Sequence, residues 1–426
     1  MKAVTLLIVG AGDRGTNYAR YALHHPDEAR IVAVAEPRDF YRERLAKVHN
    51  IPRTNVFRDW RDLANRPRLA DAVIIATQDA LHAEPAIFLT GQGYHMLLEK
   101  PMAPNEADCR RIVAAVKASG IIFAVAHVLR YTAYTAYLKK ILDDEQIGRI
   151  VCIQHMEPVG YWHQAHSFVR GNWRNERESS PMLLAKSCHD LDWIRYIMGV
   201  RCRAVSSFGS LYHFRHDNRP VGASDRCLEC AVERTCPYSA KRIYLDRVER
   251  GLGAGWPVNI ITPDPTPQNV LAALGTGPYG RCVYACDNDV VDNQVVNLLF
   301  EDGRTASFTM VAFTEMADRR TRIFGTHGEL YGDGSKIHVY KFMQDRWDVH
   351  DTQGAEPAVL GGHGGGDYRI MKAFVAAVAK NDPSLILSGP DETLETHLMV
   401  FAAERARREN RVVQLELTSS ESAPAG

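Results

Sequence analysis

The chain has 426 residues and carries 51 Lys and Arg side chains against 51 Asp and Glu, so its formal charge is zero. Apolar residues make up 46% and charged residues 24% of it, which is ordinary globular composition and excludes a fibrous or wholly disordered protein. Without an excess of basic charge we expect no nucleic-acid partner. No apolar run approaches the roughly 20 residues that span a bilayer, and the N-terminus does not resemble a secretory signal, so we expect a cytoplasmic protein without membrane contact.

Apolar runs of strand length alternate with segments of helical periodicity in the first third of the chain. The runs lie at residues 4–9, 31–35, 72–76, 95–98 and 121–126, and the helical segments at 14–24, 39–49, 82–90 and 106–119. Nearly continuous apolar strands are typical of a parallel sheet that is covered on both faces. Strand–helix alternation of this kind indicates a doubly wound sheet. We therefore predict an α/β protein whose N-terminal Rossmann domain spans residues 1–130.

The remaining chain has a different rhythm. Helices are expected at residues 132–142, 368–379 and 391–408, and strands at 150–156, 290–300, 305–313, 320–324, 329–331, 337–341 and 411–417. Another helix starts after Ser180, a good cap, with Pro181 at its first position and Gly199 at its end. Short Gly and Asp turns join most of these strands, which favours antiparallel pairing. We predict a second α/β domain over residues 131–417 with an open, mostly antiparallel sheet, and a disordered tail at 418–426.

A glycine-rich turn directly follows the first predicted strand and opens the first predicted helix. Residues 10–15 read GAGDRG, which fits the pattern G-x-G-x-x-G. The first glycine allows a tight turn, the second lets the backbone approach a pyrophosphate, and the third permits close helix–strand packing. The helix N-terminus then presents free N–H groups to the phosphates. The candidate cofactor-binding residues of this turn are Gly10, Gly12, Asp13, Arg14 and Gly15. The alternative interpretation is a structural turn without a ligand.

An acidic residue at the end of the second predicted strand indicates which dinucleotide binds. Glu36 can accept hydrogen bonds from both hydroxyls of the adenosine ribose. Its carboxylate would repel a 2′-phosphate, so we expect NAD rather than NADP. Arg38 is the counter-indication, because an arginine can pair with that phosphate.

The sequence resembles the glucose–fructose oxidoreductase and inositol dehydrogenase family (Gfo/Idh/MocA). The resemblance rests on residues 10–15, the segment from Thr77 to His82, Glu99-Lys100-Pro101 and residues 189–192, and it covers most of the chain except about 201–283. It implies a Rossmann domain and an α/β domain whose open sheet packs against a second subunit, in a homodimer or homotetramer. It also implies hydride transfer between a nicotinamide and a carbinol carbon of a sugar or cyclitol. Further candidate cofactor-binding residues are then Thr77, His82, Glu99 and Lys100.

Two side chains from the two halves of the chain are candidate proton-handling groups. Lys100 follows a parallel strand, where side chains project into the ligand crevice of an open sheet, and the resemblance places it beside the nicotinamide. An ammonium there would stabilise developing alkoxide charge. His189 resembles the family's general acid/base, and an ordinary imidazole pKa of about 6.5 suits that role. The alternatives are a surface lysine and a structural histidine.

The sequence departs from the family pattern one helical turn before His189. The family often places an aspartate four residues before the histidine, and this chain has Ala185 there. Lys186 and His189 are three residues apart on the predicted helix, so they can address one point. Lys186 is therefore a third candidate catalytic residue, which either replaces the aspartate or binds substrate. Asp190 is a candidate substrate ligand.

A loop rich in aromatic and basic residues precedes this helix. Rings suit the C–H faces of a sugar, and polar donors suit its hydroxyls. Its candidate substrate-binding residues are Tyr161, His163, His166, Arg170, Trp173 and Arg174. Two arginines would also suit an acidic group on the substrate. The alternative is a polar loop at a domain interface, and Arg130-Tyr131 is expected to be architectural.

A cysteine-containing insert, at about residues 201–286, departs from the family pattern. It contains Cys227-x-x-Cys230 and then Cys236, Cys282 and Cys286. Four thiolates at such spacing can hold a structural zinc ion, which is our preferred interpretation. An iron–sulfur cluster is the second interpretation, and free thiols or an incidental disulfide the third. The spacing does not decide whether Cys282 or Cys286 would be the fourth ligand.

Three functions are compatible with these patterns. The first is an NAD-dependent dehydrogenase that oxidises a carbinol carbon of a sugar, sugar derivative or cyclitol. The second is an NAD-dependent glycoside hydrolase that acts by transient oxidation, elimination and re-reduction, which relatives of this fold perform and which the missing aspartate at Ala185 favours. The third is a non-catalytic sensor that binds NAD and a sugar.

Overall fold

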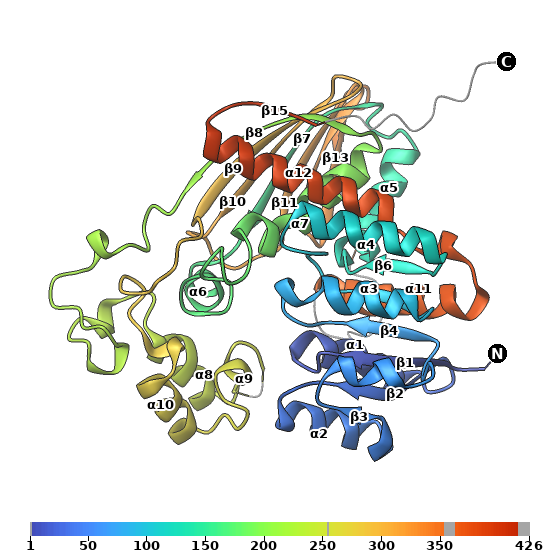
Figure 1. Ribbon diagram of the computed structural model, residues 1–426. Coiled ribbons are helices and arrows are strands. Elements are labelled where there is room, and N and C mark those ends of the chain that lie inside the picture. The colour runs from blue at the N-terminus through green and yellow to red at the C-terminus, as the bar shows by residue number, and fades with distance from the viewer. Residues whose placement is uncertain (1, 254, 353–362, 416–426) are drawn as a thin grey trace.

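The computed structural model describes residues 2–253, 255–352 and 363–415 of the chain. Within these residues the strands form one sheet of six and one sheet of nine. Figure 1 shows the six-stranded sheet towards the blue N-terminal end and helix α12 (Pro390–Glu409) running along the nine-stranded sheet. The predicted tail at 418–426 lies outside the described residues. No helix in the described part of the chain is both long and apolar enough to cross a membrane.

The first sheet is parallel throughout and has the strand order β3-β2-β1-β4-β5-β6. Its strands are β1 (Val4–Val9), β2 (Ala29–Ala35), β3 (Val56–Phe57), β4 (Ala72–Ile75), β5 (His95–Leu98) and β6 (Phe123–Val125). The strand order reverses between β1 and β4, and ligands of open α/β sheets bind at such a switch point. The predicted Rossmann sheet is confirmed, with β3 as an extra two-residue strand.

Helices cover both faces of this sheet because its strands are apolar on both faces. Leu6 and Ile8 of β1 point into one core, and Leu7 and Val9 point into the other. The first core is closed by α1 (Asp13–His24), α2 (Asp39–Val48) and α11 (Gly366–Lys380), and the second by α3 (Ala83–Gly91) and α4 (Glu106–Ser119). Helix α11 was expected in the second domain. It packs instead on the Rossmann sheet, because Ile370, Met371 and Phe374 complete the first core.

The second sheet has the order β14-β13-β12-β11-β7-β10-β9-β8-β15. Only the β7–β10 pair is parallel within it, so the predicted mostly antiparallel sheet is confirmed. Its strands are β7 (Ile150–Pro158), β8 (Cys202–Ser210), β9 (Asn293–Phe300), β10 (Thr305–Val311), β11 (Arg320–Gly325), β12 (Gly328–Gly332), β13 (Lys336–Lys341), β14 (Arg346–Asp351) and β15 (Val413–Gln414).

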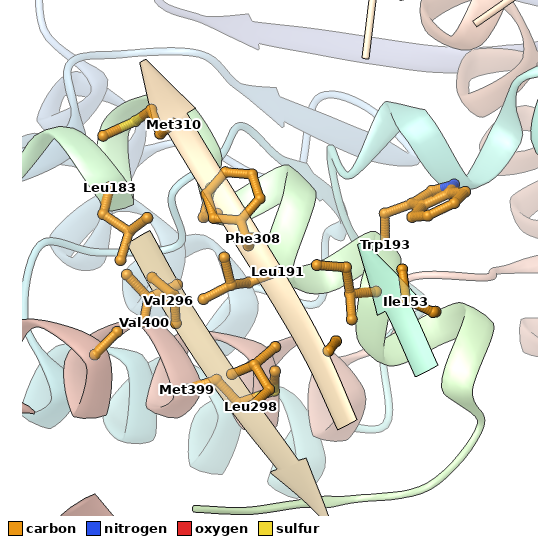
Figure 2. Packing of buried hydrophobic residues seen from close by; sticks show 14 of the residues in the cluster. Ile153, Leu183, Leu191, Trp193, Val296, Leu298, Phe308, Met310, Met399 and Val400 are labelled. Atoms are coloured by element: carbon orange, nitrogen blue, oxygen red, sulfur yellow. The ribbon is translucent and has the colours of Figure 1, made fainter. Parts of the chain in front are cut away.

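One face of the second sheet packs on helices α5 (Ala133–Asp143), α7 (Met182–Met198) and α12. Figure 2 shows this core, in which Phe308 and Val296 of the sheet approach Leu191 of α7 and Val400 of α12. Because α7 is packed along its length, the polar residues that it carries are held in fixed positions.

Helix α7 begins differently from the expectation. Pro181, predicted at the first helical position, is the N-cap residue, and no side chain caps the helix. Ser180, predicted as the cap, instead donates its hydroxyl to Asp79 Oδ2 at 3.0 Å. Asp79 belongs to the short helix η3 (Asp79–Leu81) after β4, so this bond ties the start of α7 to the Rossmann domain. The predicted end is confirmed, because Gly199 adopts a left-handed φ of 71°.

The insert lies between β8 and β9 and consists of short helices and turns. Because residues 202–210 form strand β8, it starts after the strand and not at residue 201. Its elements are η6 (His216–Asn218), η7 (Cys227–Glu229), η8 (Glu233–Thr235), η9 (Lys241–Leu245), α8 (Asp246–Glu249), α9 (Val258–Ile261), α10 (Pro267–Thr276) and η10 (Pro278–Gly280). Tyr244, Val258 and Leu274 pack it against Ala165 and Val169 of the π-helix η5 (Gln164–Arg170).

Candidate active site

The glycine turn between β1 and α1 is shaped for a dinucleotide. Gly10 has a φ of +91°, and a Cβ there would lie 2.6 Å from the Ala76 carbonyl oxygen. A Cβ on Gly15 would lie 1.9 Å from the Gly10 oxygen, so helix α1 packs against the turn only with glycine there. Gly12 is the N-cap of α1 without any side-chain cap, which leaves the helix N-terminus open to a phosphate. These residues fit NAD.

Glu36 lies at the end of β2, next to the same turn. Its Oε2 accepts the Ala11 N–H at 2.8 Å, and its Oε1 accepts Arg38 Nε at 2.7 Å. Burial would raise the pKa of Glu36, but the hydrogen bonds from Arg38 and Ala11 outweigh it and lower that pKa. The carboxylate is therefore ionised and can accept ribose hydroxyls. Arg38 is engaged by this carboxylate, which is what NAD binding requires.

Arg14 forms a buried ion-pair network that we call the brace. Its Nε donates to Glu99 Oε1 at 2.5 Å, and its Nη1 and Nη2 donate to the two oxygens of Asp367 at 2.9 and 2.6 Å. Tyr18 donates to the same Glu99 oxygen at 2.8 Å. The brace joins α1, the end of β5 and the start of α11. Arg14 and Glu99, both predicted to bind the cofactor, thus bind each other, whereas Asp13 is exposed.

His82 links the loops that follow β4 and β5. Its Nδ1 lies 2.8 Å from the Pro101 carbonyl oxygen and its Nε2 lies 3.2 Å from the Thr77 carbonyl oxygen. His82 is 1% exposed and both of its ring nitrogens are bonded to these two carbonyls, so it holds the two loops together. The Thr77 hydroxyl donates to Leu81, and Thr77 itself stays partly accessible beside the glycine turn.

Lys100 follows β5 and reaches across to the second domain. Its Nζ donates to the Ala185 carbonyl oxygen of α7 at 2.5 Å. His189 lies one turn further along α7 and is 3% exposed. Burial lowers the pKa of His189 well below its ordinary value, and the nearby Lys100 ammonium lowers it further. The structure thus brings the ammonium to the helical turn that carries the imidazole, and keeps that imidazole neutral.

Three imidazoles respond to the charge of Lys100, and we call His127, His163 and His189 the imidazole cluster. His127 and His189 are buried, and His163 is half-buried. Each has at least one buried ring nitrogen without a hydrogen-bond partner among the described residues, and His127 has two. Burial, joined by the charge of Lys100, lowers the pKa of all three, that of His127 to about 3. Buried polar atoms are nearly always paired in folded proteins. Unpaired nitrogens gathered at one place indicate a site for a polar ligand.

A second charged network lines the other side of the same turn of α7. Lys186 Nζ lies 2.8 Å from Glu157 Oε1, and Arg319 Nε lies 2.7 Å from Glu157 Oε2 and 2.8 Å from Asp190 Oδ1. Lys186 and Arg319 are 17% and 18% exposed, whereas Glu157 and Asp190 are buried behind them. Lys186 and Arg319 can therefore meet a substrate. Asp190, predicted to bind substrate, instead holds Arg319 and His155 in place.

The predicted substrate loop divides into two groups. Tyr161 and Trp173 are each 37% exposed, and the pKa of His163 responds to Lys186 and Lys100, so these three residues stay candidates. Trp173 Nε1 donates to Asp79 Oδ1 at 3.3 Å, which anchors the loop on the Rossmann domain.

The other three loop residues do not fit the predicted substrate role. His166 bonds Tyr244 at 2.8 Å and stacks on Tyr279 of the insert. Arg170 is 1% exposed and donates to two backbone carbonyls of the insert. Arg174 is paired with Asp287 at 3.0 Å. These side chains hold the loop and the insert together.

The described residues show no metal centre among the cysteines of the insert. Cys227, Cys230, Cys236 and Cys282 line one cavity of about 20 Å³, next to Arg170. No group of three or more His, Cys, Asp or Glu side chains in the described ranges is arranged to hold a metal ion, and none of the nine cysteines is in a disulfide. Burial raises the pKa of Cys236, Cys282 and Cys286. The zinc and iron–sulfur expectations are therefore not supported.

Several site residues carry no sequence signal of their own. Glu157 lies on β7, Arg319 directly precedes β11, and His127 lies two residues after β6. Only contacts across 29 to 162 positions of the chain join them to one another and to α7.

A Rossmann turn with an acid after β2, a lysine after β5 and a histidine on a helix of the second domain define an NAD-dependent oxidoreductase of two domains. Residues 4–127 match the family model described as "Oxidoreductase family, NAD-binding Rossmann fold", and residues 139–415 match that of its "C-terminal alpha/beta domain". The chain belongs to this family, Gfo/Idh/MocA.

The relatives act on several sugar-like molecules. The chain is 28% identical over 340 residues to 2,7-anhydro-N-acetylneuraminate hydratase of Mediterraneibacter gnavus, covering 79% of this chain and 81% of the relative. It is 25% identical over 212 residues to scyllo-inositol 2-dehydrogenase (NAD(+)) of Bacillus subtilis, covering 49% and 58%. Levoglucosan dehydrogenase in complex with NADH and levoglucosan has a TM-score of 0.70 at 20% identity, covering 97% and 99%, which shows a shared fold.

Proposed function

We propose that this protein oxidises a carbinol carbon of a sugar, sugar derivative or cyclitol with NAD. The observation that carries the proposal is the contact between Lys100 Nζ and the turn of α7 that ends at His189. That contact supports a site in which a cation from the Rossmann domain and an imidazole from the second domain act on the same hydroxyl. The glycine turn and Glu36 supply the fit for the dinucleotide next to it.

The two groups have complementary tasks. Bound NAD supplies the hydride acceptor. The Lys100 ammonium donates a hydrogen bond to the reacting hydroxyl and stabilises the negative charge that develops on its oxygen. His189 is neutral because it is buried, so it is ready to accept the hydroxyl proton. Lys186 and Arg319 hold the substrate at the opposite rim, and Tyr161 and Trp173 offer rings to its C–H face.

A second candidate reaction has no net oxidation. In it, oxidation of one ring carbon is followed by elimination, by addition of water, and by return of the same hydride. Two observations favour it. The match to 2,7-anhydro-N-acetylneuraminate hydratase covers about four fifths of both chains, and a hydration involves no net oxidation or reduction. The chain also has Lys186, paired with Glu157, directly after the alanine that stands where the family often has an aspartate.

One experiment separates the two reactions. Purified protein is analysed for retained dinucleotide and then mixed with levoglucosan, scyllo-inositol and 2,7-anhydro-N-acetylneuraminate, with detection of both NADH and product. Steady accumulation of NADH supports the dehydrogenase. Product without accumulated NADH supports the redox-neutral reaction. Dinucleotide uptake without turnover would support the sensor, and neither uptake nor turnover would contradict all three.

We further infer that the open face of the second sheet binds a second copy. Phe208 and Val295 are cross-strand partners on the face opposite the helices, and Trp347 and Val349 lie on β14 on that same face. They are 62%, 39%, 49% and 56% exposed. Exposed apolar side chains on one sheet face are typical of an interface. Light scattering tests this inference: a Phe208→Glu variant should be monomeric if the wild type is a dimer or tetramer.

The free thiols support the proposed cytoplasmic location.

A further inference from the structure

His189 lacks the partner that a catalytic imidazole usually has. Its Nδ1 is buried and has no hydrogen-bond partner among the described residues. Position 185, one turn before it, holds an alanine whose carbonyl oxygen is occupied by Lys100. An imidazole that accepts a proton inside a dry site becomes a buried cation, and buried cations need a nearby acceptor or counter-charge. Some other group must supply it.

His127 is the neighbour with free hydrogen-bonding capacity. It follows β6, the strand next to the one that carries Lys100, and its ring is 5.8 Å from the His189 ring at an angle of 81°. It is completely buried, and neither of its nitrogens has a hydrogen-bond partner within residues 2–253, 255–352 and 363–415. Leaving one such buried atom unpaired lowers the free energy of unfolding by about 1–3 kcal/mol. This loss of stability favours a functional role for the two nitrogens.

A neighbouring histidine shows what a purely structural imidazole looks like at this depth. The His397 ring lies 5.7 Å from His127 on another side, and it is also completely buried. Its Nε2 accepts the Met102 N–H at 2.8 Å, and its Nδ1 lies 2.8 Å from the Thr393 carbonyl oxygen. Both nitrogens are satisfied. Unpaired ring nitrogens are therefore not a general property of the buried histidines in this core.

A fixed carboxylate stands behind His127. Asp192 Oδ1 lies 3.7 Å from His127 Nε2. Arg130 holds the Asp192 carboxylate with two bonds of 2.7 and 2.8 Å, and Thr396 adds a third at 3.1 Å. Asp192 and His189 are three residues apart on α7, so the helix presents both groups on one side. His127 lies against both.

We propose that His127 is a positioning residue that relays the proton between His189 and Asp192 and so does the work of the missing aspartate. The inference rests on the proposed function. When the substrate hydroxyl is oxidised, its proton moves to His189, which then donates to His127 directly or through one water. Asp192 stays ionised and stabilises whichever imidazole carries the charge, as the acid of a catalytic triad does. Re-reduction sends the same proton back.

His363 is the competing candidate. Its ring is also 5.8 Å from His189, but its Nδ1 lies 3.3 Å from Asp367, which the brace already binds. The titratable and charged groups that act on His189 are Lys100, His127, His363 and Arg319, and those that act on His127 are Asp192, Arg130, Lys100 and His397. Only His127 combines unpaired nitrogens with a carboxylate behind it.

The test is an NMR titration of NAD-loaded protein labelled with ¹⁵N-histidine, which needs no substrate. His127→Phe keeps the ring volume and removes both nitrogens, and His127→Asn serves if the first variant does not fold. We expect the pKa of His189 to fall by about one unit or more in either variant, because a tenfold change corresponds to one lost charge-assisted hydrogen bond of about 1.4 kcal/mol. His397→Phe is the matched control and should leave that pKa unchanged, whereas His363→Phe removes a group that lowers it and should not make it fall.

Turnover gives the second readout. With the sugar that the panel identifies, His127→Phe should lower kcat about 100-fold with little change in KM, and should move the acid limb of the kcat profile to lower pH. An unchanged pKa of His189 in both His127 variants, or a shift in His363→Phe alone, would overturn the relay. A panel without any turnover would contradict the proposed function and leave the NMR result to decide the relay.

Discussion

Two groups of buried polar residues flank Lys100 and are built in opposite ways. In the brace, Arg14 is bound by two carboxylates and a tyrosine, and every partner is within hydrogen-bonding distance. In the imidazole cluster, four ring nitrogens are buried without a partner. A satisfied network fixes geometry, whereas an unsatisfied one leaves capacity for a ligand or a moving proton. The contrast indicates that the brace has a structural role, whereas the cluster takes part in ligand binding or proton transfer.

The largest effect on turnover should come from substituting Lys100, which lies between the brace and the imidazole cluster. Lys100→Met removes a charge that all three cluster imidazoles respond to and keeps the side-chain length. Turnover should fall by about 1,000-fold or more, because the alkoxide then lacks its stabilising cation. Dinucleotide content and melting temperature should stay close to wild type. A variant that retains a tenth of the activity would contradict the role of Lys100.

Breaking the brace should affect stability more than chemistry at the cluster. Arg14→Met leaves Glu99 and Asp367 buried without their counter-charge. Removing one partner of a buried pair costs about 3–5 kcal/mol, and partial exposure of Arg14 reduces this to about 2–3 kcal/mol. The urea midpoint should fall clearly. Arg58→Gln, which removes an exposed pair with Asp39, is the control and should change it little.

The cluster should reveal itself in the pH dependence of stability. The pKa of folded His127 is about 3, below the ordinary imidazole value, so between these pH values the unfolded chain binds more protons. The free energy of unfolding is therefore undiminished at neutral pH, and it decreases as the pH falls because the unfolded chain binds the proton more readily. Each such histidine contributes a slope of about 1.4 kcal/mol per pH unit. His127→Phe should make the fall in urea midpoint between pH 6 and 4 shallower, and an equal fall in both proteins would show that His127 is not held neutral.

The anchor of the substrate loop should give the smallest effect. Trp173→Phe keeps a ring and removes the N–H that binds Asp79. A hydrogen bond at a partly exposed position contributes about 1 kcal/mol. The KM should therefore rise about fivefold while kcat stays unchanged. Tyr212→Phe, an exposed ring on the insert, is the control. A fall in kcat without a change in KM would instead show that Trp173 contributes to the chemical step and not to substrate binding.

Most of the fold was predictable because it depends on local rules. Apolar runs and helical periods fix the Rossmann elements, and Gly10 and Gly15 are required by contacts within one turn. The approach of Lys100 to α7 was expected from strand-end geometry. Helix α11 was misassigned because nothing in its own sequence tells which of two cores it completes.

The rest depends on contacts between distant positions. His127 and Asp192 are 65 residues apart, and no local pattern connects them. The same holds for Arg319, which reaches Asp190 from the position directly before β11. The cysteine spacing predicted a metal because spacing alone cannot show that Arg170, 57 residues before Cys227, fills the space beside the sulfurs.

The central claim is that Lys100 and His189 act together on one hydroxyl next to NAD. The most direct measurement is a rapid-mixing experiment under single-turnover conditions, in which NAD-loaded protein meets levoglucosan, scyllo-inositol or 2,7-anhydro-N-acetylneuraminate and NADH absorbance is recorded. We predict NADH, persistent or transient, with at least one of these sugars in the wild type and none in Lys100→Met. Product formation by the wild type without NADH at any time, or the same NADH signal in the variant, would contradict the claim.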